Sequence, residues 1–379
     1  MRFTVTSENL QNKISFLGRG VSSKSQLPVL LNILMETKDG YIILNSTDLE
    51  IGIQTKIPAN VEEEGSITTP AKTFIDFINT LGSENISFQS KEGGLELKTK
   101  KTKSSFQTTP PDDFPKLYTE KGSLLFQSKK SNLTESFNKT VFAASTDFSR
   151  PALSGIYIKQ EKSEGKTSLL IVATDGYRLS LKQSFSLGLE TAKTSLLDKP
   201  ILIPVRILKE LLSLKESKED VFFYISEEKN QVLIEQGETI ILGRLINAPF
   251  PTYEKIIPQS STTKTVFNRE EMLRAVKTAA IFARDAANIV KLSITDDKIM
   301  VSANAPQVGE NSVEIEAKKT GEDNEIAFNV RYLLELLQTL EDEDIIFEMT
   351  TPTSPGVFKI KGDDSFLHLI MPIRVQSEE

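Results

Sequence analysis

Apolar residues recur with helical spacing in six stretches of this chain. Leu10 and Ile14 lie four residues apart and therefore share one helix face, and the same spacing recurs further along the sequence. Pro70 and Pro204 suit a first helical turn, and Asn329 suits a helix cap. The pattern predicts helices at residues 8–19, 70–81, 131–143, 204–215, 269–284 and 329–340.

The strand pattern is clearest at residues 170–179, which read Leu-Ile-Val-Ala-Thr-Asp-Gly-Tyr-Arg-Leu. The unbroken apolar run at the start predicts a buried strand. A tight turn is predicted at Asp175-Gly176, because this pair tolerates positive φ. Apolar and charged residues alternate after the turn, which predicts a second strand.

Two weaker copies of this stretch occur at residues 42–51 and 299–304. Asp48 and Asn304 stand there at the position of Asp175. We interpret the three positions as one shared structural turn. A catalytic carboxylate at Asp175 is the less favoured alternative.

Each repeat contains two predicted helices and several predicted strands, including residues 1–6, 40–44, 221–225, 231–234, 289–294 and 345–349. Such units predict an α+β fold with helices on one face of antiparallel sheet. Pro-rich and then polar segments near residues 110–122 and 249–263 separate the repeats. The predicted domains are residues 1–120, 121–260 and 261–379.

Composition narrows the function classes. The chain has 379 residues, 39% hydrophobic and 26% charged, as in globular proteins. No apolar run approaches the roughly 20 residues of a membrane span, and no signal peptide is evident, so we expect a cytoplasmic protein. Without cysteine, and with His368 as the one histidine, thiolate metal sites and most nucleophile–base pairs are excluded. We predict a structural role for His368, no cofactor, no metal and no enzymatic activity.

Three motifs together resemble one family. They are Ala-Thr-Asp-Gly-Tyr-Arg-Leu at 173–179, Pro-Phe-Pro-Thr-Tyr at 249–253 and Leu-Ile-Met-Pro-Ile-Arg at 369–374. The chain resembles the bacterial DNA sliding clamp, the β subunit of DNA polymerase III, over its whole length. The resemblance implies a processivity factor that forms a head-to-tail homodimer, a six-domain ring around duplex DNA of any sequence. It also implies a pocket that tethers the replicative DNA polymerase, the clamp loader and other proteins with a clamp-binding motif.

The resemblance also implies functional residues, carried over by their match to the family motifs. The partner-peptide pocket would comprise Leu153, Thr174, Gly176, Tyr177, Arg178, Leu179, Pro251, Ile256, Asn329, Tyr332, Leu369, Ile370, Met371, Pro372, Ile373 and Arg374. The DNA-facing residues would be Lys13, Lys24, Lys72, Lys139, Arg150, Arg206, Arg274, Lys277 and Arg331. The dimer interface would include Phe106, Ile281, Phe282, Lys98, Lys103 and Glu310.

Charge placement bears on the alternative, a repeat scaffold that binds no nucleic acid. The six predicted helices carry more Lys and Arg than Asp and Glu, although the whole chain has a net charge of -7. A ring with helices inside accounts for this, since phosphates attract a basic lining. For the two ends, residues 95–106 predict a basic edge strand and residues 308–316 an acidic strand. Opposite charges would then select the partner edge.

Overall fold

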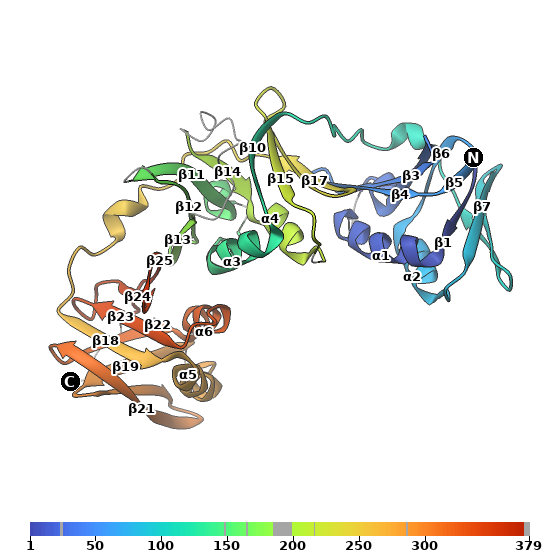
Figure 1. Cartoon of the computed structure of the whole chain (residues 1–379). Helices are drawn as coiled ribbons and strands as arrows, with labels where there is room; N and C mark the ends of the chain where they lie inside the picture. Colours follow the sequence, from blue (N-terminus) through green and yellow to red (C-terminus); the bar gives the residue numbers. More distant parts are fainter. Residues whose placement is uncertain are drawn as a thin grey trace. The chain divides into compact units, whose positions relative to one another are not determined.

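The computed structural model describes residues 1–22, 26–147, 149–163, 166–184, 199–215, 217–285 and 287–374. These residues form two compact units (Figure 1). The N-terminal unit contains residues 1–131 and 206–245, and the C-terminal unit contains residues 132–184, 199–205 and 246–374, each as far as described. No helix in the described part of the chain is long and apolar enough to cross a membrane.

The N-terminal unit contains helices α1 (Ser7–Leu17), α2 (Ala71–Thr80) and most of α4 (Val205–Ser213), with 3-10 turns η1 (Gly18–Gly20), η2 (Pro28–Leu31) and η3 (Pro111–Asp113). Its strands are β1 (Arg2–Thr6), β2 (Asn32–Lys38), β3 (Tyr41–Thr47), β4 (Ile51–Pro58), β5 (Asn60–Glu63), β6 (Gly65–Pro70), β7 (Asn85–Lys91), β8 (Gly94–Lys98), β9 (Lys103–Gln107), β10 (Ser123–Ser128), β15 (Val221–Ser226), β16 (Gln231–Gln236) and β17 (Thr239–Arg244).

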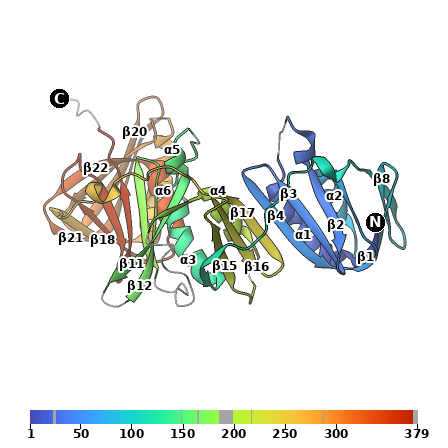
Figure 2. The same cartoon turned by 90° about the horizontal axis from the view of Figure 1, so that it is seen from above.

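These strands form a five-stranded sheet, β5-β1-β7-β8-β9, and an eight-stranded sheet, β10-β15-β16-β17-β4-β3-β2-β6. The larger sheet passes from β17 to β4 without a break (Figure 2), so strands from distant parts of the sequence share one antiparallel ladder. Leu10 and Ile14 of α1 pack with Phe74 of α2 and with Phe88 of β7 in one core. The predicted apolar helix face is therefore the buried face.

The C-terminal unit contains most of α3 (Lys130–Val141), then α5 (Arg269–Ala283) and α6 (Val330–Thr339), with 3-10 turns η4 (Pro151–Ser154) and η6 (Tyr253–Ile256). Its strands are β11 (Gly155–Ser163), β12 (Lys166–Thr174), β13 (Arg178–Ser184), β14 (Ile201–Pro204), β18 (Thr263–Asn268), β19 (Ile289–Thr295), β20 (Lys298–Ala305), β21 (Gly309–Gly321), β22 (Asn324–Asn329), β23 (Asp344–Met349), β24 (Gly356–Ile360) and β25 (Asp363–Ile370).

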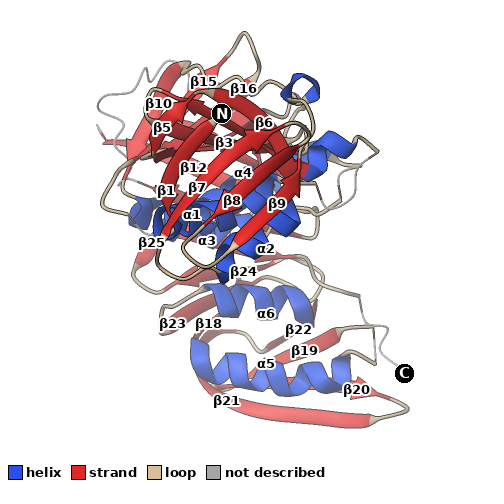
Figure 3. Ribbon diagram, turned by 90° about the vertical axis from the view of Figure 1, so that its right-hand side faces the viewer, coloured by secondary structure: helices blue, strands red, loops and turns tan. Residues whose placement is uncertain are grey.

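One twelve-stranded sheet runs through this unit in the order β14-β11-β12-β13-β25-β24-β23-β18-β21-β20-β19-β22. Within this sheet, β13 pairs with β25, which is far away in the sequence, and Arg178 lies opposite Ile370. Helices α5 and α6 lie side by side on one face of its strands (Figure 3). Asn329 caps α6 as predicted, because its Oδ1 accepts a hydrogen bond from the amide of Arg331.

The structure corrects three predictions of local structure. Pro70 and Pro204 are the last residues of β6 and β14, and each helix begins one residue later. The predicted strand at 95–106 is a hairpin of β8 and β9, in which β9 forms the edge of its sheet. Asn304 lies inside β20 opposite Glu310, so the turn predicted at that position is wrong.

Candidate functional site

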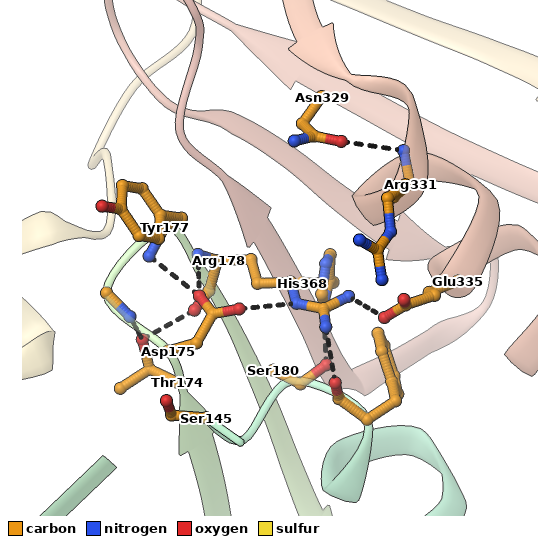
Figure 4. A network of polar contacts seen from close by, with 12 residues as sticks. Ser145, Thr174, Asp175, Tyr177, Arg178, Ser180, Asn329, Arg331, Glu335 and His368 are labelled. Atoms are coloured by element: carbon orange, nitrogen blue, oxygen red, sulfur yellow. Dashed lines mark hydrogen bonds and ion pairs between the residues drawn. The ribbon is translucent and has the colours of Figure 1, made fainter. Parts of the chain in front are cut away.

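The turn between β12 and β13, residues 174–178, is closed by its own side chains (Figure 4); we call it the Arg178 turn. Thr174 Oγ1 donates to the carbonyl of Arg178 at 2.6 Å and accepts from the amide of Gly176 at 3.1 Å. Asp175 Oδ1 accepts from the amides of Tyr177 at 2.9 Å and Arg178 at 3.0 Å. Gly176 has φ of +91°, which only glycine adopts without strain.

The side chain of Arg178 connects this turn to two other elements. Its Nε donates to Asp175 Oδ2 at 3.1 Å, and its Nη2 donates to the carbonyl of Phe142, just after α3, at 2.7 Å. Its Nη1 lies 2.6 Å from Glu335 Oε2 on α6, and the guanidinium lies 4.6 Å from the ring centroid of Tyr332. Arg178 is buried, so two carboxylates and an aromatic face compensate a charge withdrawn from water.

Apolar side chains are exposed beside this buried network. Tyr177 is 57% exposed and Met371 37% exposed. The amide of Met371 donates to the carbonyl of Tyr177 at 2.8 Å, and the Tyr177 ring stacks on Tyr332 at 6.5 Å. A Cβ atom at Gly176 would lie 4.0 Å from Leu153, which places that side chain next to the turn. Burial raises the pKa of Tyr332, so its hydroxyl is neutral at ordinary pH.

The other residues predicted for the pocket range from buried in the core to exposed. Leu179 and Leu369 are buried in one core cluster with Tyr253, and Ile370 is buried in another. Ile256 on η6 is 42% exposed, and Pro251 is also exposed. The remaining members of the C-terminal motif follow β25: Pro372 and Ile373 are half-buried, and Arg374 is exposed.

His368 lies in the same unit as the Arg178 turn, on β25 opposite Ser180 of β13. Its Nδ1 is 2.7 Å from Ser180 Oγ, and its ring stacks on Phe142 at 5.2 Å. Burial, and then the charge of Arg178, holds the pKa of His368 well below its ordinary value. The imidazole is therefore neutral. It packs on Phe142, whose backbone carbonyl accepts a hydrogen bond from Arg178, and this agrees with the predicted structural role.

Asp363, at the start of β25, lies in an ion-pair cluster. Burial raises the pKa of Asp363, but hydrogen bonds from Ser365 and Lys182 outweigh burial and lower the pKa to about 2. Lys182 Nζ lies 2.9 Å from the Asp363 carboxylate, and Lys139 Nζ lies 4.0 Å from it. Lys139 also lies 3.5 Å from Asp342, so this predicted DNA-facing lysine is engaged by two acids.

The first repeat contains the same turn at residues 47–51. Thr47 Oγ1 donates to the carbonyl of Ile51, and Asp48 Oδ1 accepts from the amides of Glu50 at 3.1 Å and Ile51 at 3.0 Å. Leu49 has φ of +78° at the position of Gly176. Asp48 also pairs with Arg206 on α4. Two repeats thus share the turn, which confirms the structural interpretation of Asp175 over the catalytic one.

The other predicted DNA-facing residues differ in how far they are paired. Lys72 and Lys277 are exposed and form no ion pair with any residue that the structure describes. Arg274 pairs with Glu270 at 3.3 Å, one turn away on α5. Arg150 pairs with Asp147 at 3.2 Å. The remaining members of the set are Lys13, 3.5 Å from Thr239 Oγ1, exposed Arg331, and Lys24, which lies outside the described residues.

On the first predicted interface edge, Phe106 of β9 is only 8% exposed. Its ring packs edge-on against Phe74 and Phe77 of α2, with centroids 5.3 Å away in both cases. Lys98 and Lys103 both contact Glu96 of their own chain, together with Lys91. Hydrogen bonds from Lys91 and Lys98 are the main cause that lowers the pKa of Glu96 to about 2.

On the second predicted edge, β21 has two different halves. Residues 317–321 pair with β18, whereas residues 309–316 pair with β20 alone among the described strands. This half, which includes exposed Glu310, therefore has a free backbone edge. Ile281 of α5 is 61% exposed, and Phe282 lies 3.8 Å from a Cβ built at Gly309.

Two residues that contact the Arg178 side chain, Glu335 and Phe142, were not predicted from the sequence. Glu335 belongs to the repeated pattern of a base and an acid four residues apart, and this pattern does not indicate that Glu335 pairs with Arg178. Phe142 contributes a backbone carbonyl, which any residue type would supply. Within the described ranges, no group of three or more His, Asp or Glu residues could hold a metal ion.

Comparison with known proteins identifies the family. Residues 1–118 match the N-terminal domain of the DNA polymerase III beta subunit, residues 127–252 its central domain, and residues 254–374 its C-terminal domain. The chain belongs to the DNA polymerase III beta subunit family. The beta sliding clamp of Synechococcus elongatus is 28% identical over 385 residues, covering all of both chains. That of Staphylococcus aureus strain Mu50 is 28% identical over 388 residues, covering 99% of each chain.

Solved structures of this family match the fold over the same length. The sliding clamp of Bartonella birtlesii bound to griselimycin has a TM-score of 0.92 and 27% identity, covering 99% of this chain and 100% of that chain. The clamp of Bacillus subtilis has a TM-score of 0.90 and 28% identity, with the same coverage. The fold thus consists of three clamp domains. The chain is a processivity factor of DNA replication and not an enzyme, which decides against the scaffold interpretation.

Proposed function

We propose that two copies of this chain close head to tail into a six-domain ring that encircles duplex DNA. The likeness to the Bartonella birtlesii clamp, over 99% of this chain, carries this proposal. We place the domains at residues 1–120, 121–260 and 261–379, supported by the family matches and by the proline-rich segments between them. Because the two contacting edges differ, the contact is head to tail, and a closed ring of two copies contains it twice.

The surface at the Arg178 turn is the proposed docking site for partner peptides. The contacts of Arg178 with Asp175, Glu335 and Phe142 hold the turn in place. Tyr177 and Met371 offer exposed apolar area there, and Leu153 lies next to Gly176. Short linear peptides bind through a few apolar anchors, and the flexible thioether of Met371 can adapt to several of them. The proposed partners are the replicative DNA polymerase, the clamp loader and other proteins with the same peptide motif.

The proposed DNA contacts are with phosphate, not with bases. Lys72 and Lys277 support this best, since both are exposed and free of ion pairs among the described residues. Contacts of this kind depend on salt and carry no sequence information, so a ring held by them can slide. Lys139 and Arg206, held by acids of their own chain, would contribute less.

The proposed ring contact joins β9 of one copy to β21 of the other. Both present free strand edges, which can pair across a dimer. The three lysines around Glu96 leave the first edge positive, and Glu310 lies on the second. Exposed Ile281 is the proposed apolar anchor beside this edge.

Retention on circular DNA tests the ring. Protein loaded on a circular plasmid should co-elute with it, and cutting the plasmid once should release the protein. A plasmid without the cleavage site is the control. Retention on the linear product would refute encirclement.

The docking site has a matched test. Tyr177→Ser with Met371→Ser should weaken binding of a polymerase-derived peptide at least about tenfold, because both anchors are removed. Leu49→Ser removes an exposed side chain from the equivalent turn, where Leu49 is 56% exposed, and should leave affinity unchanged. Equal losses in both variants would contradict the assignment.

A further inference from the structure

The sulfur atoms of this protein differ in their access to solvent. The chain has six methionines and no cysteine, so thioethers are its only sulfur groups. Four of them lie buried in the hydrophobic cores: Met1, Met35, Met272 and Met349. Met300 is half-buried, and Met371 is the most exposed of the six. Because oxidation follows exposure and no thiol competes, Met371 is the sulfur group that a dissolved oxidant reaches first.

The main chain at Met371 is held against the Arg178 turn. Its amide donates to the carbonyl of Tyr177 at 2.8 Å. The preceding residue, Ile370, is buried and lies opposite Arg178 in the β13–β25 pair. The thioether is therefore accessible to solvent at a fixed place beside Tyr177, and a chemical change there acts on the surface proposed for docking.

Met300 of β20 provides an internal comparison in the same unit. It lies opposite Ser293 of β19 and Glu314 of β21, so cross-strand neighbours flank it on both sides. Met300 is not among the residues of the proposed docking site. Oxidation of Met300 should therefore be slower than that of Met371 and should not affect a bound peptide.

We propose that Met371 is a redox-sensitive modification site, at which hydrogen peroxide forms methionine sulfoxide and thereby releases partner peptides. The sulfur lone pair attacks one oxygen of the peroxide, so that an S–O bond forms while the O–O bond breaks. The proton on the transferred oxygen passes to the leaving hydroxide, which departs as water. The sulfur is oxidised by two electrons, and the peroxide is reduced.

The physical reason for release is the polarity of the product. A thioether is apolar and flexible, whereas a sulfoxide is polar and keeps water at its oxygen. An apolar anchor of a peptide that packs on this group would have to remove that water, which costs free energy. Arg178 does not offset the cost, because its three nitrogens already contact Asp175, Glu335 and the carbonyl of Phe142.

Peroxide treatment of the full chain, followed by mass spectrometry of its fragments, measures the oxidised fraction at each methionine. Met371 should be oxidised several times faster than Met300, and the four buried methionines more slowly still. An excess of the polymerase-derived peptide should slow oxidation of Met371 and leave that of Met300 unchanged. The release of peptides rests on the proposed docking function, whereas the preferred oxidation of Met371 does not.

Fluorescence anisotropy with the same peptide compares each protein with its own untreated sample. Treatment should weaken binding by the unchanged chain about tenfold, and methionine sulfoxide reductase should restore it. Met371→Leu keeps the volume and the apolar character but has no sulfur at this position, so its affinity should not respond to peroxide. Met300→Leu is the matched control, since it retains Met371 and should respond as the unchanged chain does.

Three results would overturn the inference. They are oxidation of another methionine before Met371, unchanged affinity of a chain whose Met371 is fully oxidised, and an equal loss of affinity in treated Met371→Leu. Failure of the untreated chain to bind the peptide would instead refute the docking site, and with it the release of peptides. The mass spectra alone would then decide whether Met371 is the preferred site of oxidation.

Discussion

The two equivalent turns allow the charge at the Arg178 turn to be measured against an internal standard. Asp175→Asn and Asp48→Asn each remove one negative charge and keep an Oδ1 that can accept the two backbone hydrogen bonds. The substitutions differ in the arginine left behind. Arg178 is 7% exposed, whereas the Arg206 side chain is 33% exposed.

The expected magnitudes follow from this difference in burial. Removing one partner of a buried ion pair costs about 3–5 kcal/mol when nothing replaces it. Arg178 keeps Glu335 and the carbonyl of Phe142, so we expect Asp175→Asn to lower the free energy of unfolding by ~2 kcal/mol. Arg206 keeps Glu50 at 3.4 Å and is hydrated, so Asp48→Asn should cost less than ~1 kcal/mol.

Urea unfolding monitored by circular dichroism gives the two free-energy changes. Because two compact units need not unfold in one step, hydrogen exchange at each turn should be followed in parallel. The amides of Tyr177 and Arg178 should keep their protection in Asp175→Asn, since the acceptor remains. A loss in Asp48→Asn as large as that in Asp175→Asn would refute the argument from burial.

Three further predictions concern pH and the interface. The lowered pKa of Asp363 gives stability that is present above the unfolded value of 3.8 and lost as pH falls through about 2, so acid titration of Asp363→Asn should show a flatter loss over that range. The single imidazole signal, from His368, should not titrate by NMR between pH 8 and 5; a midpoint near its ordinary value of 6.5 would contradict its burial. Phe106→Ala should destabilise the fold by about 3–5 kcal/mol, because Phe106 is part of the core, whereas Ile281→Ala should change unfolding by less than about 0.5 kcal/mol yet weaken the dimer in sedimentation. An Ile281→Ala variant that remains dimeric at low micromolar concentration would show that the interface lies elsewhere.

The sequence by itself determined the helices and strands that have a regular pattern, because the spacing of apolar residues indicates which positions are buried. The predicted helices at 269–284 and 329–340 correspond to α5 (Arg269–Ala283) and α6 (Val330–Thr339). The turn at Asp175 was also predictable, since the side chains of Thr174 and Asp175 bond to the backbone within four residues and Gly176 adopts a positive φ. Local interactions of this kind depend only on neighbours in the chain.

The tertiary structure decided which distant residues meet, because side-chain spacing says nothing of partners far along the chain. Arg178 and Glu335 form their ion pair across a long sequence separation. The hydrogen bond from Arg178 to the Phe142 carbonyl could not be predicted, because every residue type has a backbone carbonyl. Phe106, predicted from the resemblance as an interface residue, lies against the aromatic side chains of α2.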